Sequence, residues 1–212
     1  MADFQHFLPG LMGREGGYVD HPADPGKETY AGVARAYNPQ WRGWALVDAV
    51  KTKLCLHSPV PAAKYAAINQ ALHGNAEMQV LISAFYKASY WDELQLDHVS
   101  SQALAEQMAD HGTNAGTSRP AKMIQFAVNQ VAGKPLLVVD GQLGMKSVTA
   151  INAADQAKLL KAFVQLRRDH YEYRTGVRTP APDVLALLKS LKVVPDPTQK
   201  VFLKSWLARL PK

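Results

Sequence analysis

The sequence predicts a mainly α-helical protein. Helix boundaries recur along its 212 residues: Asn75 precedes AEMQVLISAFYKASYWDEL, and Gly133 follows PAKMIQFAVNQVAG. Asparagine is favoured at a helix N-cap, and glycine is favoured just past a helix end. Alternating strand patterns are scarce, and only KPLLVVDG and part of residues 17–34 are candidates for short strands. We therefore expect helices throughout, with at most a short β element.

The expected helices have recognisable first and last residues. The first covers residues 3–15, with Asp3 as its cap, and another covers residues 61–74, with proline in its first turn and glycine at its end. A long helix over residues 147–174 has a possible break at Asp155. The remaining helices are expected after Asn75, after Ser100, after Thr117 or Ser118, over VLALLKSL and over QKVFLKSWLARL.

Composition fits an ordinary soluble globular protein. Hydrophobic residues make up 47% of the chain and charged residues 20%, which is enough apolar material for one compact domain or two small ones. No apolar run approaches the roughly 20 residues that cross a bilayer. The N-terminus lacks the basic region and continuous apolar run of a signal peptide. We expect synthesis in the cytoplasm without a signal peptide, and no stable membrane insertion.

The chain is basic. Its 24 Lys and Arg residues against 18 Asp and Glu residues give a net charge of +6, and the sequence pI is about 9.4. This excess favours a polyanionic partner, such as nucleic acid, an anionic lipid surface or an acidic wall polymer. The cations are spread along the sequence without a run of five or more, so they indicate general attraction and not a mapped binding stripe.

Metal and thiol chemistry find little support in the sequence. Cys55 has no second cysteine to pair with and lies in a segment expected to be helical, where a buried structural thiol is expected. The seven histidines show no H-E-x-x-H or other ligand spacing. Asp20, His21 and Asp24 lack the alternating oxygen ligands and the closing glutamate of a calcium loop. No metal or cofactor is expected.

The most informative stretch is EGGYVDHPADPGKETYAG, residues 15–32. On a helical wheel Glu15 continues the apolar stripe of Phe4, Leu8 and Leu11. A carboxylate on the apolar side of a helix end loses hydration and meets the negative pole of the helix dipole, and both effects raise its pKa. Such a glutamate holds a proton that it can donate as a general acid. A solvated glutamate at a frayed helix end is the alternative.

The loop that follows Glu15 adds possible partners for it. Gly16 and Gly17 can end the helix and allow a bulky ligand to approach the backbone. Asp24 follows nine residues after Glu15, and Thr29 five residues later, with proline and glycine stiffening the path between them. A general acid, a second carboxylate and a hydroxyl that can hold a water are what inverting glycosidic cleavage requires. Asp24 could instead cap a turn, and Thr29 could be a strand residue.

These residues carry a family resemblance. EGGYVDHPADPGKETYAGV resembles the N-terminal signature of the glycoside hydrolase family 108 N-acetylmuramidases, which are also labelled secretion activators. The E-x8-D-x4-T spacing is also similar to the E-x8-D-x5-T set of phage-type lysozymes. Farther along, SYWDEL, MADHGTNAGTSRPAKMIQFAVNQ, VVDGQLGMKSVTAI and FLKSWLARL resemble the peptidoglycan-binding region predicted to follow the muramidase segment in that family. The family's T-N-x-G reads TYAG at residues 29–32, and Lys27 and Glu28 stand where glycine is common.

The resemblance implies a lysozyme-like helical fold with a short β element near the active-site loop. It implies a muramidase segment over residues 1–96 and a helical peptidoglycan-binding-like segment over residues 97–212, packed together into one compact unit. Glu15 carries over as the proton donor. Asp24 and Thr29 carry over as the groups that orient the attacking water and stabilise the oxocarbenium-like transition state.

Other residues have two possible roles. Tyr18 and Tyr30 are either platforms on which a sugar ring stacks or core residues. Asn114, in the N-x-G of the second family-like segment, either hydrogen bonds an N-acetyl group or caps the next helix. Trp91 and Trp206 lie in apolar helical patterns, and we expect both to pack in the core.

The implied function is a peptidoglycan hydrolase that cleaves the β-1,4 bond between N-acetylmuramic acid and N-acetylglucosamine in glycan strands. This is a bacteriolytic, endolysin-like activity on the cell wall, with export through a holin or a dedicated secretion system. A lytic transglycosylase, which needs one glutamate and no second carboxylate, remains open, as does a non-catalytic wall-binding module. AEQMADHGTNAGTSRPAKMIQFAVNQ superficially resembles helix-turn-helix, but its second helix offers only Lys122 as a cation, so no nucleic acid partner is expected.

Overall fold

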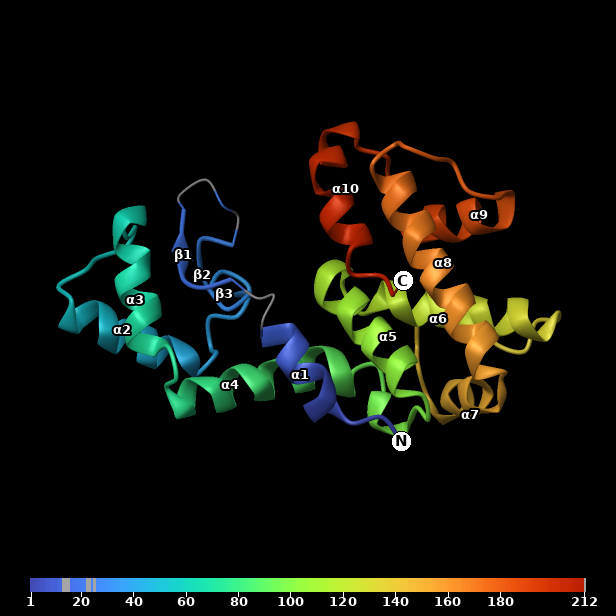
Figure 1. The fold of residues 1–212 in the computed structure, drawn as a ribbon, viewed down its shortest axis with the longest axis horizontal. Coiled ribbons are helices and arrows are strands. Elements are labelled where there is room, and N and C mark those ends of the chain that lie inside the picture. Colours follow the sequence, from blue (N-terminus) through green and yellow to red (C-terminus); the bar gives the residue numbers. More distant parts are fainter. Residues whose placement is uncertain (13–15, 22–23, 25, 212) are drawn as a thin grey trace. The chain divides into compact units, whose positions relative to one another are not determined.

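The computed structural model describes residues 1–12, 16–21, 24 and 26–211. It is helical over most of this length and contains a small three-stranded sheet, which confirms the mainly α prediction (Figure 1). The chain forms two compact units, one of Gln5–Ala88 and one of Met1–Phe4 with Ser89–Lys212. The functional division predicted between residues 96 and 97 remains a prediction.

The unit formed by Gln5–Ala88 combines helices with the sheet. Its cap signals operate as predicted: the side chain of Asn75 accepts a hydrogen bond from Met78 N at 2.9 Å and begins a helix. The elements in chain order are α1 (Phe4–Met12), β1 (Val19–Asp20), β2 (Glu28–Tyr30), β3 (Val33–Ala34), α2 (Gly43–Lys53), the 3-10 helix η1 (Ala62–Lys64), α3 (Tyr65–Leu72) and α4 (Ala76–Tyr86).

The sheet is an antiparallel meander in the order β1-β2-β3. Thr29 at its centre pairs with Val19 on one side and Ala34 on the other. The β2–β3 connection is a two-residue turn in which Ala31 and Gly32 have φ of 46° and 77°. Left-handed residues at both positions match the twist of the flanking strands, which is why such turns favour glycine. The short β element expected within residues 17–34 is therefore confirmed.

Helix α1 buries an apolar face that differs by one position from the predicted stripe. Phe7 and Leu11 are 4% and 2% exposed, whereas Leu8 is only half-buried. Residues three and four apart share a helix face, so Phe4, Phe7 and Leu11 form a stripe as regular as the predicted one. The predicted continuation of this helix to Glu15 lies outside the described residues.

The second unit contains helices and irregular segments but no strand in its described residues. Helix α8 packs against α5, α6, α7, α9 and α10, which places it at the centre of this unit (Figure 1). The π-helix η2 (Lys87–Asp92) spans the boundary between the two units in the sequence and precedes the other elements of this unit. The other elements are η3 (Leu96–His98), α5 (Gln102–Ala115), α6 (Ser118–Ala132), α7 (Met145–Ala153), α8 (Gln156–Arg174), α9 (Pro182–Ser190), η4 (Pro197–Gln199) and α10 (Lys200–Leu207).

Predicted helix boundaries in this unit are largely confirmed. Asp155 separates α7 from α8, and its side chain accepts a hydrogen bond from Lys158 N at 3.0 Å. Thr117 precedes α6, and Gly133 ends it with φ of 65°. The cap of α5 is Ser101, one residue after the predicted Ser100. No helix in the described residues is long and apolar enough to cross a bilayer.

The strand predicted over KPLLVVDG is wrong. Residues 134–141 form an irregular segment that side chains of α6 hold in place. The side-chain carbonyl of Asn129 accepts hydrogen bonds from Leu136 N at 2.9 Å and Leu137 N at 2.8 Å. Gln125 accepts another from Gly141 N at 2.8 Å. These amide side chains take the place of a neighbouring strand, so the segment needs no β partner.

Two predictions about single side chains also have clear outcomes. Cys55 is exposed and lies just beyond the end of α2 with φ of 53°, so the expectation of a buried helical thiol was wrong. Trp91 is fully buried and packs edge-on against Phe4 at 5.5 Å, which confirms its core role. Trp206 is only half-buried, and the exposed Phe202 stacks on it with 6.0 Å between ring centroids.

Candidate active site

Glu15, the predicted proton donor, lies outside the described residues. The described surroundings of the site consist of the residues that follow Glu15 in the sequence and of the elements that hold them. These are the two glycines at 16 and 17, the sheet formed by β1, β2 and β3, and helices α2 and α3.

Asn69 of α3 fixes the backbone directly after the E-G-G segment. Its Oδ1 accepts a hydrogen bond from Tyr18 N at 2.6 Å. Its amide group also lies 2.4–2.6 Å from the position that a Cβ on Gly17 would take. Only a residue without a side chain fits there while Asn69 keeps this position. Asn69 was not predicted as a site residue; its local signal in the sequence is only a polar residue beside Ile68, which is buried in α3.

Tyr18 lies in the core. Only 1% of its surface is exposed, and its ring packs edge-on against Tyr65 at 5.4 Å. Its hydroxyl donates a hydrogen bond to Glu28 Oε1 at 2.7 Å. Burial, followed by this contact with Glu28, raises the pKa of Tyr18, so its hydroxyl stays protonated. Of the two roles left open for Tyr18, the structure supports the core role, because no ring face is left on which a sugar could stack.

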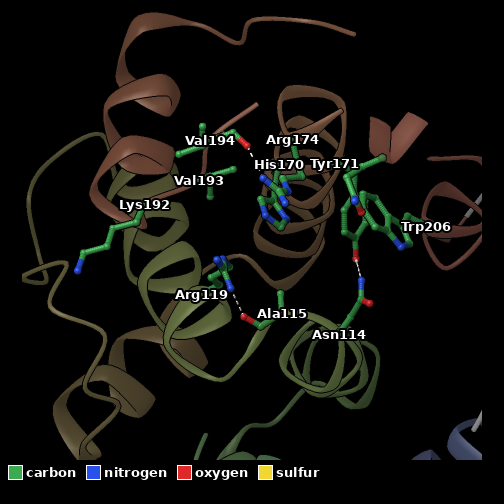
Figure 2. Close-up of a pocket in the computed structure, with 11 residues that line it drawn as sticks. Asn114, Ala115, Arg119, His170, Tyr171, Arg174, Lys192, Val193, Val194 and Trp206 are labelled. Atoms are coloured by element: carbon green, nitrogen blue, oxygen red, sulfur yellow. Dashed lines mark hydrogen bonds between the residues drawn. The ribbon is translucent and has the colours of Figure 1, made fainter. Parts of the chain in front are cut away.

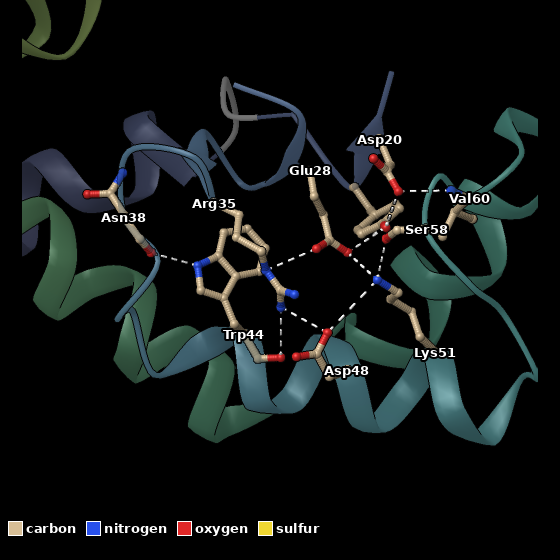
Figure 3. A network of polar contacts seen from close by, with 10 residues as sticks. Asp20, Glu28, Arg35, Asn38, Trp44, Asp48, Lys51, Ser58 and Val60 are labelled. Atoms are coloured by element: carbon tan, nitrogen blue, oxygen red, sulfur yellow. Dashed lines mark hydrogen bonds and ion pairs between the residues drawn. The ribbon is translucent and has the colours of Figure 1, made fainter. Parts of the chain in front are cut away.

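The buried carboxylate of Glu28 is the centre of a network of charges that joins β2 to α2 (Figure 3). Lys51 Nζ lies 2.7 Å from its Oε1, and Arg35 Nε lies 3.0 Å from its Oε2. Arg35 also pairs with Asp48 at 2.9 Å. A buried carboxylate is tolerated when cations and hydrogen bonds surround it. The network ties β2 to α2 and so holds the strand that carries Thr29.

Asp20 extends this network to the segment that follows α2. Its Oδ2 accepts a hydrogen bond from Val60 N at 2.8 Å, and the Tyr18 hydroxyl lies 3.4 Å away. Lys51 also donates to Ser58 Oγ at 2.7 Å. In the sequence, Glu28 stands out only as a departure from the family pattern. Its partners lie up to 23 residues away, and no local pattern identifies them.

The structure brings Asp24 and Thr29 together at Gly26. Asp24 is exposed, and its Oδ1 accepts a hydrogen bond from Gly26 N at 2.8 Å. Asp24 Oδ1 and Thr29 Oγ1 lie 3.3 Å and 3.5 Å from the position of a Cβ added to Gly26. The turn role and the strand role considered for these two residues are both observed. Their catalytic roles remain predictions, and the second oxygen of Asp24 is not used by this turn.

A pocket of about 180 Å³ opens beside the residues that follow Glu15. Gly16, Gly17 and Asn69 form part of its wall, and Tyr30 and Ala31 at the end of β2 form another part. Tyr30 is 6% exposed, and burial raises the pKa of its hydroxyl. Tyr30 is thus mostly buried, yet it borders an open space. Its predicted role as a sugar platform remains a prediction.

Asn114 belongs to the other unit. It lies in the last turn of α5, and its Nδ2 donates a hydrogen bond to the Tyr171 hydroxyl at 3.4 Å. Thr117, not Asn114, is the residue preceding α6, so the helix-cap alternative is wrong. Asn114 lines a separate pocket on this unit. Its predicted contact with an N-acetyl group remains a prediction.

Comparison with known proteins identifies the family. The family model described as glycosyl hydrolase 108 matches residues 8–116, which is just over half of the chain. No curated protein matches this chain. Among solved structures, that of Brucella abortus SagA is similar, with 21% sequence identity and a TM-score of 0.54 over 97% of this chain and 88% of that one. At this identity the likeness shows a shared fold, in agreement with the predicted lysozyme-like helical fold. The matched residues include the E-G-G-Y segment, Asp24, Thr29 and Asn69, and the chain belongs to glycosyl hydrolase family 108 and is a glycoside hydrolase.

Proposed function

We propose that this glycoside hydrolase is an N-acetylmuramidase, which cleaves the β-1,4 bond between N-acetylmuramic acid and N-acetylglucosamine in peptidoglycan. Family membership supports a peptidoglycan-hydrolysing, lysozyme-like function. The observation that carries the proposal is the pocket of about 180 Å³ beside Gly16 and Gly17, with Asn69 holding the adjoining backbone. Residue 15 is a glutamate, and it comes directly before Gly16, which lines this pocket.

In the proposed reaction Glu15 acts as the general acid. Its proton passes to the glycosidic oxygen as the bond to the sugar breaks, and positive charge develops on the sugar ring. Asp24 accepts a proton from the attacking water, and Thr29 helps to hold that water. The convergence of Asp24 Oδ1 and Thr29 Oγ1 at Gly26 supports this pairing. The two roles belong to an inverting mechanism.

The narrow pocket fits a short part of a substrate and not a whole glycan chain. Tyr30 and Asn69 both line the pocket beside the glycines; an aromatic ring suits the apolar face of an amino sugar, and an amide suits its N-acetyl group. Glycine at positions 16 and 17 keeps the backbone free of side chains where a bulky ligand approaches.

Peptidoglycan glycan strands are the proposed partner, and the cell wall is the proposed place of action. The net charge of +6 supports accumulation on anionic wall polymers. In this proposal the protein reaches the wall through a holin or a dedicated secretion system.

One observation favours a lytic transglycosylase as a second candidate. Asp24 already uses one carboxylate oxygen to hold Gly26 N at 2.8 Å, as a turn residue does. A transglycosylase needs the acid at position 15 and no second carboxylate, because the substrate's own hydroxyl attacks and leaves a 1,6-anhydro end.

Digestion of purified peptidoglycan by wild type and Glu15→Gln separates these candidates. A muramidase releases fragments with ordinary reducing ends, and loss of the general acid lowers the rate by about 10²- to 10⁴-fold. Reducing-end assays and mass spectrometry of the fragments measure both. Fragments one water lighter would identify a transglycosylase. Undiminished cleavage by Glu15→Gln would show that Glu15 is not the general acid. The unfolding temperature of the variant, compared with that of wild type, shows whether a loss of cleavage comes from the missing acid or from a damaged fold.

A further inference from the structure

A pocket of about 360 Å³ lies within the unit that contains Ser89–Lys212 (Figure 2). Its wall combines the end of α5, the first turn of α6, the last turns of α8, the segment after α9, and α10. This volume is far larger than a single ion needs and suits a small organic group. The pocket shares no lining residue with the one beside Gly16 and Gly17, and no step of the proposed cleavage uses it.

The charge of the pocket wall is positive. Arg119, Arg174 and Lys192 line it, and none of its lining residues is Asp or Glu. Arg119 donates to the carbonyl oxygen of Ala115, and Arg174 donates to Val194 O at 2.6 Å, so these contacts leave both charges in place. Across the described residues neither Arg119 nor Lys192 has an ion-pair partner. Only Arg174 has one, Asp196 at 3.7 Å.

His170, which also lines the pocket, carries a polar atom without a hydrogen-bond partner among the described residues. The residue is 6% exposed, and within the described chain its Nδ1 is buried without a hydrogen-bond partner. Burial, then the charges of Arg119, Arg174 and Arg167, lower the pKa of His170 to about 3. The ring is therefore neutral at neutral pH. A buried polar atom without a partner is costly, and a ligand that reaches the ring can relieve that cost.

The remaining wall is aromatic and amide in character. Tyr171 and Trp206 lie 5.5 Å apart between ring centroids and are tilted by 37°, and Asn114 donates to the Tyr171 hydroxyl (Figure 2). Phe202 stacks on Trp206 at 6.0 Å and holds the indole in its half-buried position. Tyr171 is 1% exposed and supports the wall from behind, so the half-buried indole of Trp206 is the group that suits the apolar part of a ligand, and the amide of Asn114 suits a peptide-like group.

A second hollow adjoins the pocket and extends its positive surface. It has a volume of about 520 Å³, shares Arg119 and Lys192 with the pocket, and adds Lys122. Thr117 and Ser118 at the start of α6 also line it, and the N-terminal end of a helix attracts negative charge. A ligand with several negative groups spaced along a chain fits this arrangement better than one small anion does.

We infer that this pocket binds a carboxylate of the peptide that peptidoglycan carries on its muramic acid. The cations of Arg119, Arg174 and Lys192 take the carboxylate, and the side chains of Asn114 and Trp206 take the adjoining amide and apolar groups. The identity of the peptide rests on the proposed function; the carboxylate chemistry rests on the pocket alone. None of the residues that line this site lines the pocket beside Gly16 and Gly17, and the site recognises the peptide and not the glycosidic bond.

The test uses the full chain and muramyl dipeptide, N-acetylmuramoyl-L-alanyl-D-isoglutamine. This ligand contains a single sugar and therefore no glycosidic bond between sugars for the enzyme to cleave. Calorimetry measures its dissociation constant, and NMR follows the ring C–H signal of His170, assigned with His170→Gln. The same molecule with its carboxylate converted to an amide is the matched ligand, and inorganic phosphate is the second probe.

Lys192→Gln is the main variant, since Lys192 is exposed and its loss does not endanger the fold. Lys189→Gln is its matched control, because Lys189 is also exposed, lies three residues earlier and lines neither hollow. Arg174→Gln is the second variant, with its unfolding temperature measured alongside. Removing one cation that pairs with a carboxylate weakens binding by about 5- to 10-fold.

We expect the dipeptide to shift the His170 signal, the amide to bind at least about 10-fold more weakly, and Lys192→Gln but not Lys189→Gln to weaken binding. Equal affinity for acid and amide, or an unchanged affinity in Lys192→Gln, overturns the inference. So does tighter binding of phosphate than of the dipeptide, which would make the pocket a phosphate site. Cleavage of peptidoglycan without dipeptide binding refutes this inference alone, whereas dipeptide binding without cleavage refutes the proposed muramidase alone.

Discussion

Asn69 Oδ1 accepts a hydrogen bond from the backbone N–H of Tyr18 at 2.6 Å. Through this contact a residue of α3 fixes the chain three residues after Glu15. We expect Asn69→Ala to lower kcat/KM on peptidoglycan by about 10-fold, because a loosened backbone misplaces the acid. The loss of one hydrogen bond should lower the free energy of unfolding by only about 1 kcal/mol. Turbidity assays and urea denaturation measure the two effects.

Gln70→Ala is the matched control for this variant. Gln70 is the next residue of the same helix and is exposed, so its truncation changes neither the backbone after Glu15 nor the pocket. Wild-type kcat/KM in Asn69→Ala would show that the hydrogen bond to Tyr18 serves the fold and not the reaction.

Gly17→Ala should reproduce the effect of Asn69→Ala. The added methyl group would lie 2.4 Å from Asn69 Oδ1, which is too close for any real contact. The simplest relief is a rotation of the Asn69 side chain, and this breaks its hydrogen bond to Tyr18. We therefore expect the double variant Gly17→Ala/Asn69→Ala to be about as active as either single variant, since both act through one contact. Rates of digestion for the three variants form the cycle.

Gly144→Ala is the steric control for that cycle. A methyl group on Gly144 meets no atom within 4 Å, and the residue lines neither the pocket of about 360 Å³, nor the hollow that adjoins it, nor the pocket beside Gly16 and Gly17. Its activity should equal that of wild type. Fully additive losses for Gly17→Ala and Asn69→Ala would count against a shared contact.

Asp24→Asn separates the charge of Asp24 from its role in the turn. The amide oxygen of asparagine can accept the hydrogen bond that Gly26 N now donates to Asp24 at 2.8 Å, so the loop and its stability should be kept. If Asp24 is the base, the rate of cleavage should fall by about 10²-fold or more, because an amide cannot take the proton of the water. Thermal unfolding and reducing-end assays on the same preparation give both values.

Asp24→Ala completes this comparison, because it removes the charge and the turn contact together. Equal rates in wild type and Asp24→Asn, with a loss only in Asp24→Ala, would restrict Asp24 to the turn. That result would favour the transglycosylase, which needs no second carboxylate.

Removing only one charge of the Glu28–Lys51 pair should strongly lower the free energy of unfolding. Glu28→Gln takes from the buried ammonium group of Lys51 its carboxylate partner at 2.7 Å and leaves it Asp48 at 3.9 Å, and such a loss typically destabilises a protein by about 3–5 kcal/mol. The double variant Glu28→Gln/Lys51→Met should recover part of this loss, because it also removes the ammonium group that has lost its closest partner. Asp48→Asn should cost less, since the Asp48 side chain is 52% exposed. Urea denaturation of the four proteins measures the differences, and a double variant no more stable than Glu28→Gln would contradict the pairing.

Local signals predicted much of the fold. The caps at Asn75 and Asp155 and the helix end at Gly133 could be located because each depends on a few neighbouring residues. The irregular segment of residues 134–141 could not, since side chains of α6 replace the strand partner that its apolar pattern suggested. On a helical wheel of α1, Phe7 and Leu8 are equally compatible with a buried stripe. Only the packing of the folded chain determines that Phe7 is the buried residue.

The sequence indicated which segment carries the candidate site, but it did not indicate which residues surround that segment in the folded protein. Family-like residues located Glu15, Asp24 and Thr29, and the structure places the last two together at Gly26. The contacts of Asn69 with Tyr18 and of Lys51 with Glu28 join residues 51 and 23 positions apart. Contacts of that range depend on the folded arrangement of helices and strands, and no periodicity in a single sequence encodes them.

His170 should make the protein less stable in acid. Burial, with the charges of Arg119, Arg174 and Arg167, lowers its pKa to about 3 in the folded state, whereas an unfolded histidine has a pKa near 6.5. Above pH 6.5 the ring is neutral in both states and contributes no pH dependence. Between pH 6.5 and 3 the unfolded chain binds a proton that the folded protein does not. The free energy of unfolding therefore falls by about 1.4 kcal/mol per pH unit from this group, and by about 5 kcal/mol in total.

Urea denaturation at pH 7.5, 5.5 and 4.5 tests this expectation with wild type and His170→Gln. The variant has no ring to titrate, so its stability should decline less steeply between pH 6.5 and 4.5. His111 contributes in the same direction, because burial and then the neighbouring His170 and Arg167 also lower its pKa, and part of the slope should persist in the variant. His98→Gln is the control, since His98 is exposed in the same unit. If His170→Gln and wild type lose stability in parallel, His170 is able to take up a proton in the folded protein, and the neutral ring inferred for the pocket is wrong.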